Sequence, residues 1–191
     1  MLEALPYRHD SIEAAGRSGE RPRPVCMVAK ELRTGQIWRL WRGEFESAPP
    51  FPIGADTLFI AYYASAELGC FRVLNWTAPA NILDLFAEFR DRTNGLPTPA
   101  GSGLVGALAY FGIGAVAAVE KDAMRAIVLA GGPWDEAQRA AILRYCESDV
   151  LALERLLLAM LPRIDRLRSR LRGRYMTVSY THLTLPTILR V

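Results

Sequence analysis

The segment Tyr145-Cys-Glu-Ser-Asp149 places a phenol and a carboxylate four residues apart, which makes them neighbours on one face of a helix. The surrounding residues 140–160 carry apolar side chains at three- and four-residue intervals, and this pattern predicts an amphipathic helix. Asp149 falls within or beside the apolar stripe, where an unpaired carboxylate is costly to desolvate. We therefore expect Asp149 to have a partner, and a metal ion is one candidate.

Two other carboxylates belong to separate predicted elements: Glu67 follows a strand and Asp84 lies where a strand runs into a helix. Carboxylate oxygens suit hard cations such as Mg²⁺. A pair of such ions can stabilise both the attacking and the leaving oxygen when a phosphodiester is hydrolysed. The alternative is structural: Glu67 caps its helix, Asp84 accepts backbone hydrogen bonds, and Asp149 pairs with an arginine.

The elements that must position these residues alternate between strands and helices. Apolar runs and turn residues predict strands over 25–32, 36–41, 57–63 and 81–86, the first two as a hairpin around Gly35. Helices are predicted over 65–71, 103–111, 120–130 and 135–161, with Ser65 and Asp135 at two of the starts. This order predicts an α/β fold with a mixed sheet, antiparallel at first and later joined through helices.

Residues 10–162 resemble the ribonuclease-H-like 3′–5′ exonuclease domain of family A DNA polymerases, the type with four acidic residues and a tyrosine. The strongest part of the resemblance is Tyr145-x-x-x-Asp149. It implies that Asp149 binds metal and that Tyr145 orients the attacking water. In the stretch 61–67, Ala-Tyr-Tyr-Ala-Ser-Ala-Glu, Glu67 takes the place of the second motif's aspartate, with a side chain one methylene longer.

The first motif of that family is Asp-x-Glu on the opening strand, and here the matching residues are Asp10 and Glu13. A spacing of three sends two side chains to opposite faces of a regular strand, whereas a spacing of two keeps them together. Three interpretations stay open: a bulge corrects the register, the N-terminus is damaged by a wrong start or a frame error, or the site is inactive.

The resemblance implies a ribonuclease-H-like mixed sheet flanked by helices and a metal-dependent 3′–5′ exonuclease, the proofreading module of a DNA polymerase. It further implies two Mg²⁺ or Mn²⁺ ions, a single-stranded DNA 3′ end as substrate, and a polymerase domain in cis that this chain lacks. Whether this chain is an active enzyme is left open. The alternatives are an inactive ribonuclease-H-like scaffold or DNA-binding module, and a ribonuclease of the same superfamily. The expected catalytic residues are Glu13, Glu67, Tyr145 and Asp149, and the expected metal ligands are Asp10, Glu13, Glu67 and Asp149.

The expected organisation has four parts. Residues 1–24 are an irregular or damaged segment with a remnant of the first motif, and residues 25–162 are the exonuclease-like domain. Residues 163–177 are an arginine-rich helix or linker towards the missing domain; a phosphate-binding groove and a solvated helix face are both possible roles for its arginines. Residues 178–191 match the translation of a transposase adapter used in shotgun DNA libraries and are expected to pack poorly.

Composition sets the remaining expectations for this chain of 191 residues, which has a formal net charge of +3. Only two histidines are present, so histidine-based nucleophilic chemistry is not expected. The three cysteines are far apart in apolar surroundings, which favours free buried thiols and a reducing cytoplasm. No apolar run approaches the roughly 20 residues that span a bilayer, so no membrane partner is expected.

Overall fold

The structure is a computed structural model that describes residues 2–4, 23–114, 123–124, 126–128 and 130–182. Within them the chain has a mixed α/β fold with more helix than strand. Asp10, Glu13 and residues 183–191 lie outside the described residues, as do residues 120–122, 125 and 129 of the predicted helix 120–130, of which residues 123–124 and 126–128 are helical.

The predicted hairpin is confirmed as strands β2 (Pro24–Lys30) and β3 (Ile37–Trp41), which pair antiparallel from Cys26↔Trp41 to Lys30↔Ile37. Gly35 has a φ of 76°, a left-handed conformation that glycine adopts readily, so the turn forms there. The first residues of β2 are buried on both faces of the strand. Cys26 and Val28 pack against the long helix α6, whereas Met27 packs with residues of helix α2.

A short strand, β1 (Leu2–Ala4), pairs antiparallel with the outer edge of β2 and lies against α2. The sequence indicated no strand in residues 1–24, and that prediction was wrong for these three residues. A three-residue strand is too short to show a period-2 pattern, and its pairing depends on β2, which is distant in the sequence.

Strands β4 (Phe59–Ala61) and β5 (Ile82–Asp84) form a parallel pair, and α2 (Ala64–Val73) makes the crossover between them. Parallel strands need such a connection, which explains why helix and strand alternate here. The described strands therefore form two small sheets, in the orders β1-β2-β3 and β4-β5, and not the one mixed sheet that the sequence predicts. The α/β class itself is confirmed, and it combines antiparallel and parallel pairing as expected.

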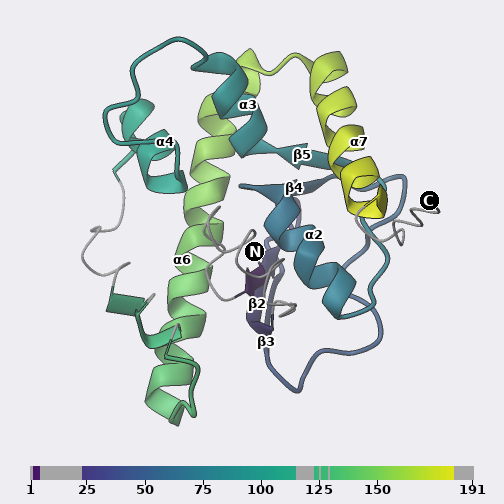
Figure 1. The fold of residues 1–191 in the computed structure, drawn as a ribbon, viewed down its shortest axis with the longest axis vertical. Helices are drawn as coiled ribbons and strands as arrows, with labels where there is room; N and C mark the ends of the chain where they lie inside the picture. Colours follow the sequence, from purple (N-terminus) through teal and green to yellow (C-terminus); the bar gives the residue numbers. More distant parts are fainter. Residues whose placement is uncertain (1, 5–22, 115–122, 125, 129, 183–191) are drawn as a thin grey trace, which may run out of the picture.

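Helix α3 (Leu85–Arg92) follows β5 directly, and α4 (Leu104–Tyr110) comes after a loop. Helix α6 (Glu136–Met160) begins with a capping box in which the Asp135 side chain accepts from the Gln138 amide while the Gln138 side chain accepts from the Asp135 amide. A short 3₁₀ turn, η1 (Leu161–Arg163), leads into α7 (Arg166–His182), which contains the arginine-rich segment. Figure 1 shows α6 running the length of the molecule, with α2 and α7 on the other side of the strands.

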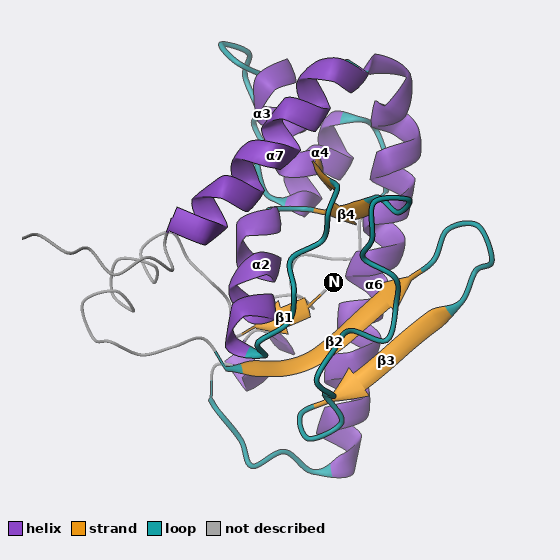
Figure 2. Ribbon diagram, turned by 90° about the vertical axis from the view of Figure 1, so that its right-hand side faces the viewer, coloured by secondary structure: helices purple, strands orange, loops and turns teal. Residues whose placement is uncertain are grey.

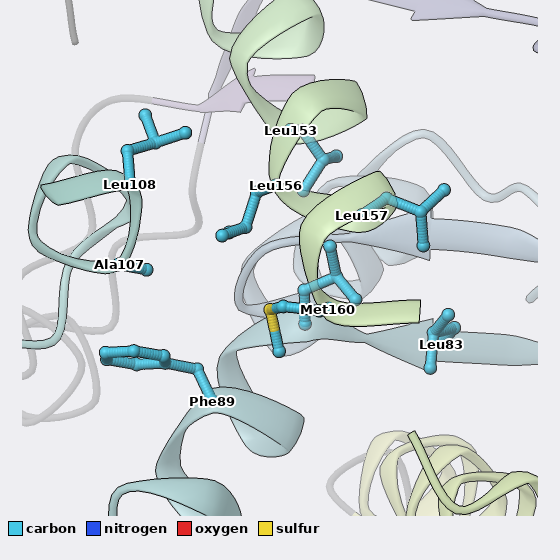
Figure 3. Packing of buried hydrophobic residues seen from close by; sticks show 9 residues of the cluster. Leu83, Phe89, Ala107, Leu108, Leu153, Leu156, Leu157 and Met160 are labelled. Carbon is cyan, nitrogen blue, oxygen red and sulfur yellow. The ribbon is translucent and has the colours of Figure 1, made fainter. Parts of the chain in front are cut away.

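The largest core cluster joins the second half of α6 to β5, α3 and α4. Figure 3 shows the α6 side chains Leu153, Leu156, Leu157 and Met160 together with residues of these elements. The buried members of the cluster are Leu83, Leu85, Phe89, Ala107, Leu108, Leu153, Leu156, Leu157 and Met160. A second cluster joins α6 to β2, so one helix connects both sheets.

Helix α7 packs closely against β5, as Figure 1 shows, and Figure 2 shows α7 next to α2. A Cβ atom at Gly173 would lie 2.0 Å from the carbonyl oxygen of Ile82, so only glycine allows this approach. The guanidinium of Arg172 also donates to both carboxylate oxygens of the buried Glu88, at 2.7 and 2.5 Å. Close backbone contact and a bidentate ion pair thus fix α7 on the domain.

We predict that Gly173→Ala destabilises the protein, because the added methyl group forces α7 away from β5. The matched control is Gly69→Ala, also inside a helix, where an added Cβ would meet no atom within 4 Å. There the better helix propensity of alanine should stabilise the protein by up to about 1 kcal/mol. Urea unfolding of both variants checks the pair, and equal behaviour of the two would contradict the close packing of α7.

Candidate functional site

The carboxylate of Asp84 holds the carboxyl ends of β4 and β5 together. One oxygen accepts from the backbone amides of Tyr63 and Phe86, each at 3.0 Å, and the other accepts from the amide of Ala64 at 3.1 Å. Asp84 is therefore the N-cap of α3 and also receives amides from the start of α2. A single buried side chain fixes where both helices begin.

The Asp84 side chain is desolvated at this position, since the residue is only 3% exposed. Burial raises the pKa of Asp84 above its ordinary value, and the backbone hydrogen bonds counteract part of that shift. Its carboxylate in turn adds to the effect of burial in raising the pKa of the neighbouring Tyr62 phenol. Asp84 is thus engaged with backbone donors, which is the structural role that the sequence left open for it.

Glu67 lies in the first turn of α2, and it is 3% exposed. It does not cap its helix, because the N-cap is Tyr63, which has a left-handed φ of 73° and makes no side-chain cap. The carboxylate of Glu67 is close enough to the thiols of Cys70 and Cys146 to contribute to their raised pKa values. In Cys70 burial is the larger cause, and in Cys146 a hydrogen bond with Cys26 is the largest.

Asp149 lies on the inward face of α6 and is 7% exposed, while Tyr145, one turn earlier, is half-buried. Cys146 lies between them in the sequence and packs on β2. Cys146 and Asp149 are three residues apart and both buried, so they share the face of α6 that covers the strands. The carboxylate of Glu67 is therefore near the same turn of α6 that carries Tyr145 and Asp149.

The remaining predicted ligands, Asp10 and Glu13, lie outside the described residues. Across the part of the chain that the structure describes, no group of three or more His, Cys, Asp or Glu side chains could hold a metal ion. The described candidates for metal ligands are two buried carboxylates, those of Glu67 and Asp149. Their oxygen atoms are the donors that Mg²⁺ and Mn²⁺ prefer, so the pair fits part of such a site.

Glu3, which is not among the residues that the sequence indicated as ligands, lies in β1. The register of β1 places its backbone opposite Cys26, the residue that is hydrogen-bonded to Cys146. Glu3 therefore belongs to the strand that lies between β2 and α2. An acidic residue in the first few residues of the chain was the only indication in the sequence, and the three-residue strand that contains it could not be recognised.

Several tryptophans pack against other aromatic side chains of the domain. Trp76 is buried against Phe71, and its indole N–H donates to the backbone carbonyl of Glu46 at 2.8 Å. Trp41 lies edge-on to Trp134. These side chains support the core, as expected for most tryptophans in a domain of this size.

Comparison of the chain with models of known families, with curated proteins and with solved structures finds no match. Among the residues that the structure describes, none of the helices is both long enough and apolar enough to cross a membrane.

We predict that Asp84→Ala destabilises the protein by about 2–4 kcal/mol, since it removes an N-cap and leaves buried amides without an acceptor. The control is Asp135→Ala, which removes the exposed cap of α6 and should cost only about 1 kcal/mol. Chemical unfolding measures both. A loss for Asp84→Ala no larger than that for Asp135→Ala would contradict the double role of Asp84.

The raised pKa of Asp84 also predicts a pH dependence. Between the ordinary pKa of 3.8 and the higher folded value, the folded protein binds a proton that the unfolded chain has released. The contribution of Asp84 to stability therefore falls as the pH rises through the folded pKa. Unfolding free energies measured against pH should show this fall in the wild type relative to Asp84→Ala, and a difference that rises with pH would contradict it.

Proposed function

We propose that this protein is a metal-dependent 3′–5′ exonuclease module of the ribonuclease-H-like type, which hydrolyses phosphodiesters at single-stranded DNA 3′ ends. The observation that carries the proposal is the pair of buried carboxylates, Glu67 and Asp149. They come from different helices, one following β4 and the other at the end of the predicted motif. Both are under 10% exposed, and Glu67 is near the turn of α6 that includes Cys146.

Carboxylate oxygens are the ligands that hard divalent cations prefer. Mg²⁺ or Mn²⁺ would supply charge stabilisation for the attacking and leaving oxygens of a phosphodiester. Glu67 and Asp149 would hold such ions, and the remaining ligands would come from the N-terminal segment, where Asp10, Glu13 and Glu3 are the candidates.

Tyr145 precedes Asp149 by one helical turn on the same side of α6, and it is half-buried. Its role in the proposal is to orient a water molecule by hydrogen bonding. Asp84 acts differently: its oxygens are occupied by backbone amides, and it positions Glu67 by fixing the start of α2. Asp84 is therefore a positioning residue in this scheme.

The alternative function is an inactive scaffold or DNA-binding module with the same fold. It is favoured if the N-terminal carboxylates do not converge with Asp149, since two carboxylates alone leave the metal sites incomplete. In both proposals the expected polymerase domain in cis supplies the context in which a 3′ end would be presented.

We predict that the chain shortens a 5′-labelled single-stranded DNA from its 3′ end with Mg²⁺ or Mn²⁺, and that EDTA stops the reaction. Asp149→Ala should abolish cleavage, because it removes a metal ligand. Tyr145→Phe should reduce the rate by at most about 10²-fold, because only the positioning of water suffers. Product lengths on a denaturing gel, with thermal unfolding of each variant, provide the measurement.

The matched control is Glu147→Gln on the same helix. Glu147 forms an ion pair with Arg39 of β3 and is not among the proposed metal ligands, so this substitution should leave cleavage unchanged. A folded wild-type chain that binds DNA and does not cleave it would favour the scaffold. Cleavage that survives Asp149→Ala would exclude the proposed site.

A further inference from the structure

The arginines of α7 fall into two sets with different surroundings. Arg172 is paired with Glu88 and with Asp91, and Arg168 is paired with Asp165 at the start of the helix. The second set is Arg166, Arg170 and Arg174. All three are exposed, and in the described part of the chain no hydrogen bond or ion pair neutralises any of them.

These three arginines line one cavity of about 540 Å³. They are four residues apart in the helix, so they lie on a single face at steps of about 6 Å. The opposite wall consists of the loops that lead into β4 and β5, with Asp56, Thr57, Ala80 and Asn81 among its residues. We call this cavity the α7 groove.

The charge of the α7 groove is positive. Of the lining residues that the structure describes, Asp56 is the one that is acidic, against three arginines. Guanidinium groups are permanently charged and their donor geometry matches phosphate oxygens. Three neighbouring cations repel one another, and an anion with regularly spaced charges relieves that repulsion.

Among the described residues that line the groove there is no aromatic side chain. Proteins that hold single strands combine positive charge with aromatic platforms for the bases. A groove with arginines and no such platform is suited to contacts with phosphates alone, and such contacts position a nucleic acid without reading its sequence.

The groove is firmly built into the domain. The Arg172–Glu88 ion pair and the close approach of Gly173 to Ile82 fix the helix that carries the arginine row. The groove lies beside the amino ends of β4 and β5, whereas Asp84 marks their carboxyl ends. It is therefore separate from the candidate nuclease site.

We propose that the α7 groove binds the sugar–phosphate backbone of duplex DNA through Arg166, Arg170 and Arg174. The identity of the polyanion as DNA rests on the proposed function. The site would hold the duplex at a distance from the candidate nuclease site while a frayed 3′ end is processed there.

The test is equilibrium binding of a fluorescent DNA duplex, followed by anisotropy over a series of salt concentrations with EDTA present. The variant is the triple substitution Arg166→Gln, Arg170→Gln and Arg174→Gln. We expect binding at low salt to weaken by about ten- to a hundredfold and the salt slope to fall by about two to three units, since each phosphate contact contributes about 0.9. Asp56→Asn should instead tighten binding.

The matched control removes the same charge elsewhere, with Arg33→Gln, Arg155→Gln and Arg168→Gln. These exposed residues do not line the groove. Equal weakening in the control triple would show a net-charge effect only and would overturn the proposal, as would a wild type that does not bind the duplex. EDTA suppresses cleavage, so this assay measures binding alone. The groove proposal can therefore hold even if the nuclease proposal fails, and the two outcomes can be told apart.

Discussion

The described structure depends most on the buried carboxylate of Asp84. Its oxygens accept amide protons from the first residues after β4 and from the first turn of α3. Amides at helix starts are otherwise without partners, and the helix dipole favours negative charge there. Two helix N-termini therefore share one anion, and its hydrogen bonds and these dipoles offset part of the cost of burial. Without it, the start of α2 would lose its buried acceptor.

By fixing the start of α2, Asp84 also fixes the position of Glu67 in the first turn of that helix. Tyr63 is held in a left-handed conformation so that α2 begins directly after the strand, and Glu67 follows one turn later on the inward side. Helix α6 is fixed independently by its capping box and by its packing on β2 and on the α3–α4 region. Asp149 is a buried residue of this helix. The two acidic residues thus depend on two different sets of contacts.

The sequence predicted the elements whose signals are local. The hairpin follows from an apolar run and Gly35, and α6 follows from its periodicity and from Asp135. Elements that depend on distant partners were less predictable. Ser65 was expected to begin α2, yet the helix starts at Ala64 and its capping acceptor comes from Asp84. The arginine run showed that this segment is positively charged, but it did not show which arginines face the domain. Tertiary packing decides this: Arg172 pairs with Glu88, whereas three other arginines of α7 line the groove.

The most direct test of the central claim, that Glu67 and Asp149 form one metal-dependent site, is paramagnetic NMR with Mn²⁺ added to the amide spectrum. If the two carboxylates share one site, amides around Glu67 and around Asp149 broaden first and together, while amides in the middle of α7 stay sharp. Broadening at only one of the two acidic residues, or first along α7, would contradict a shared site.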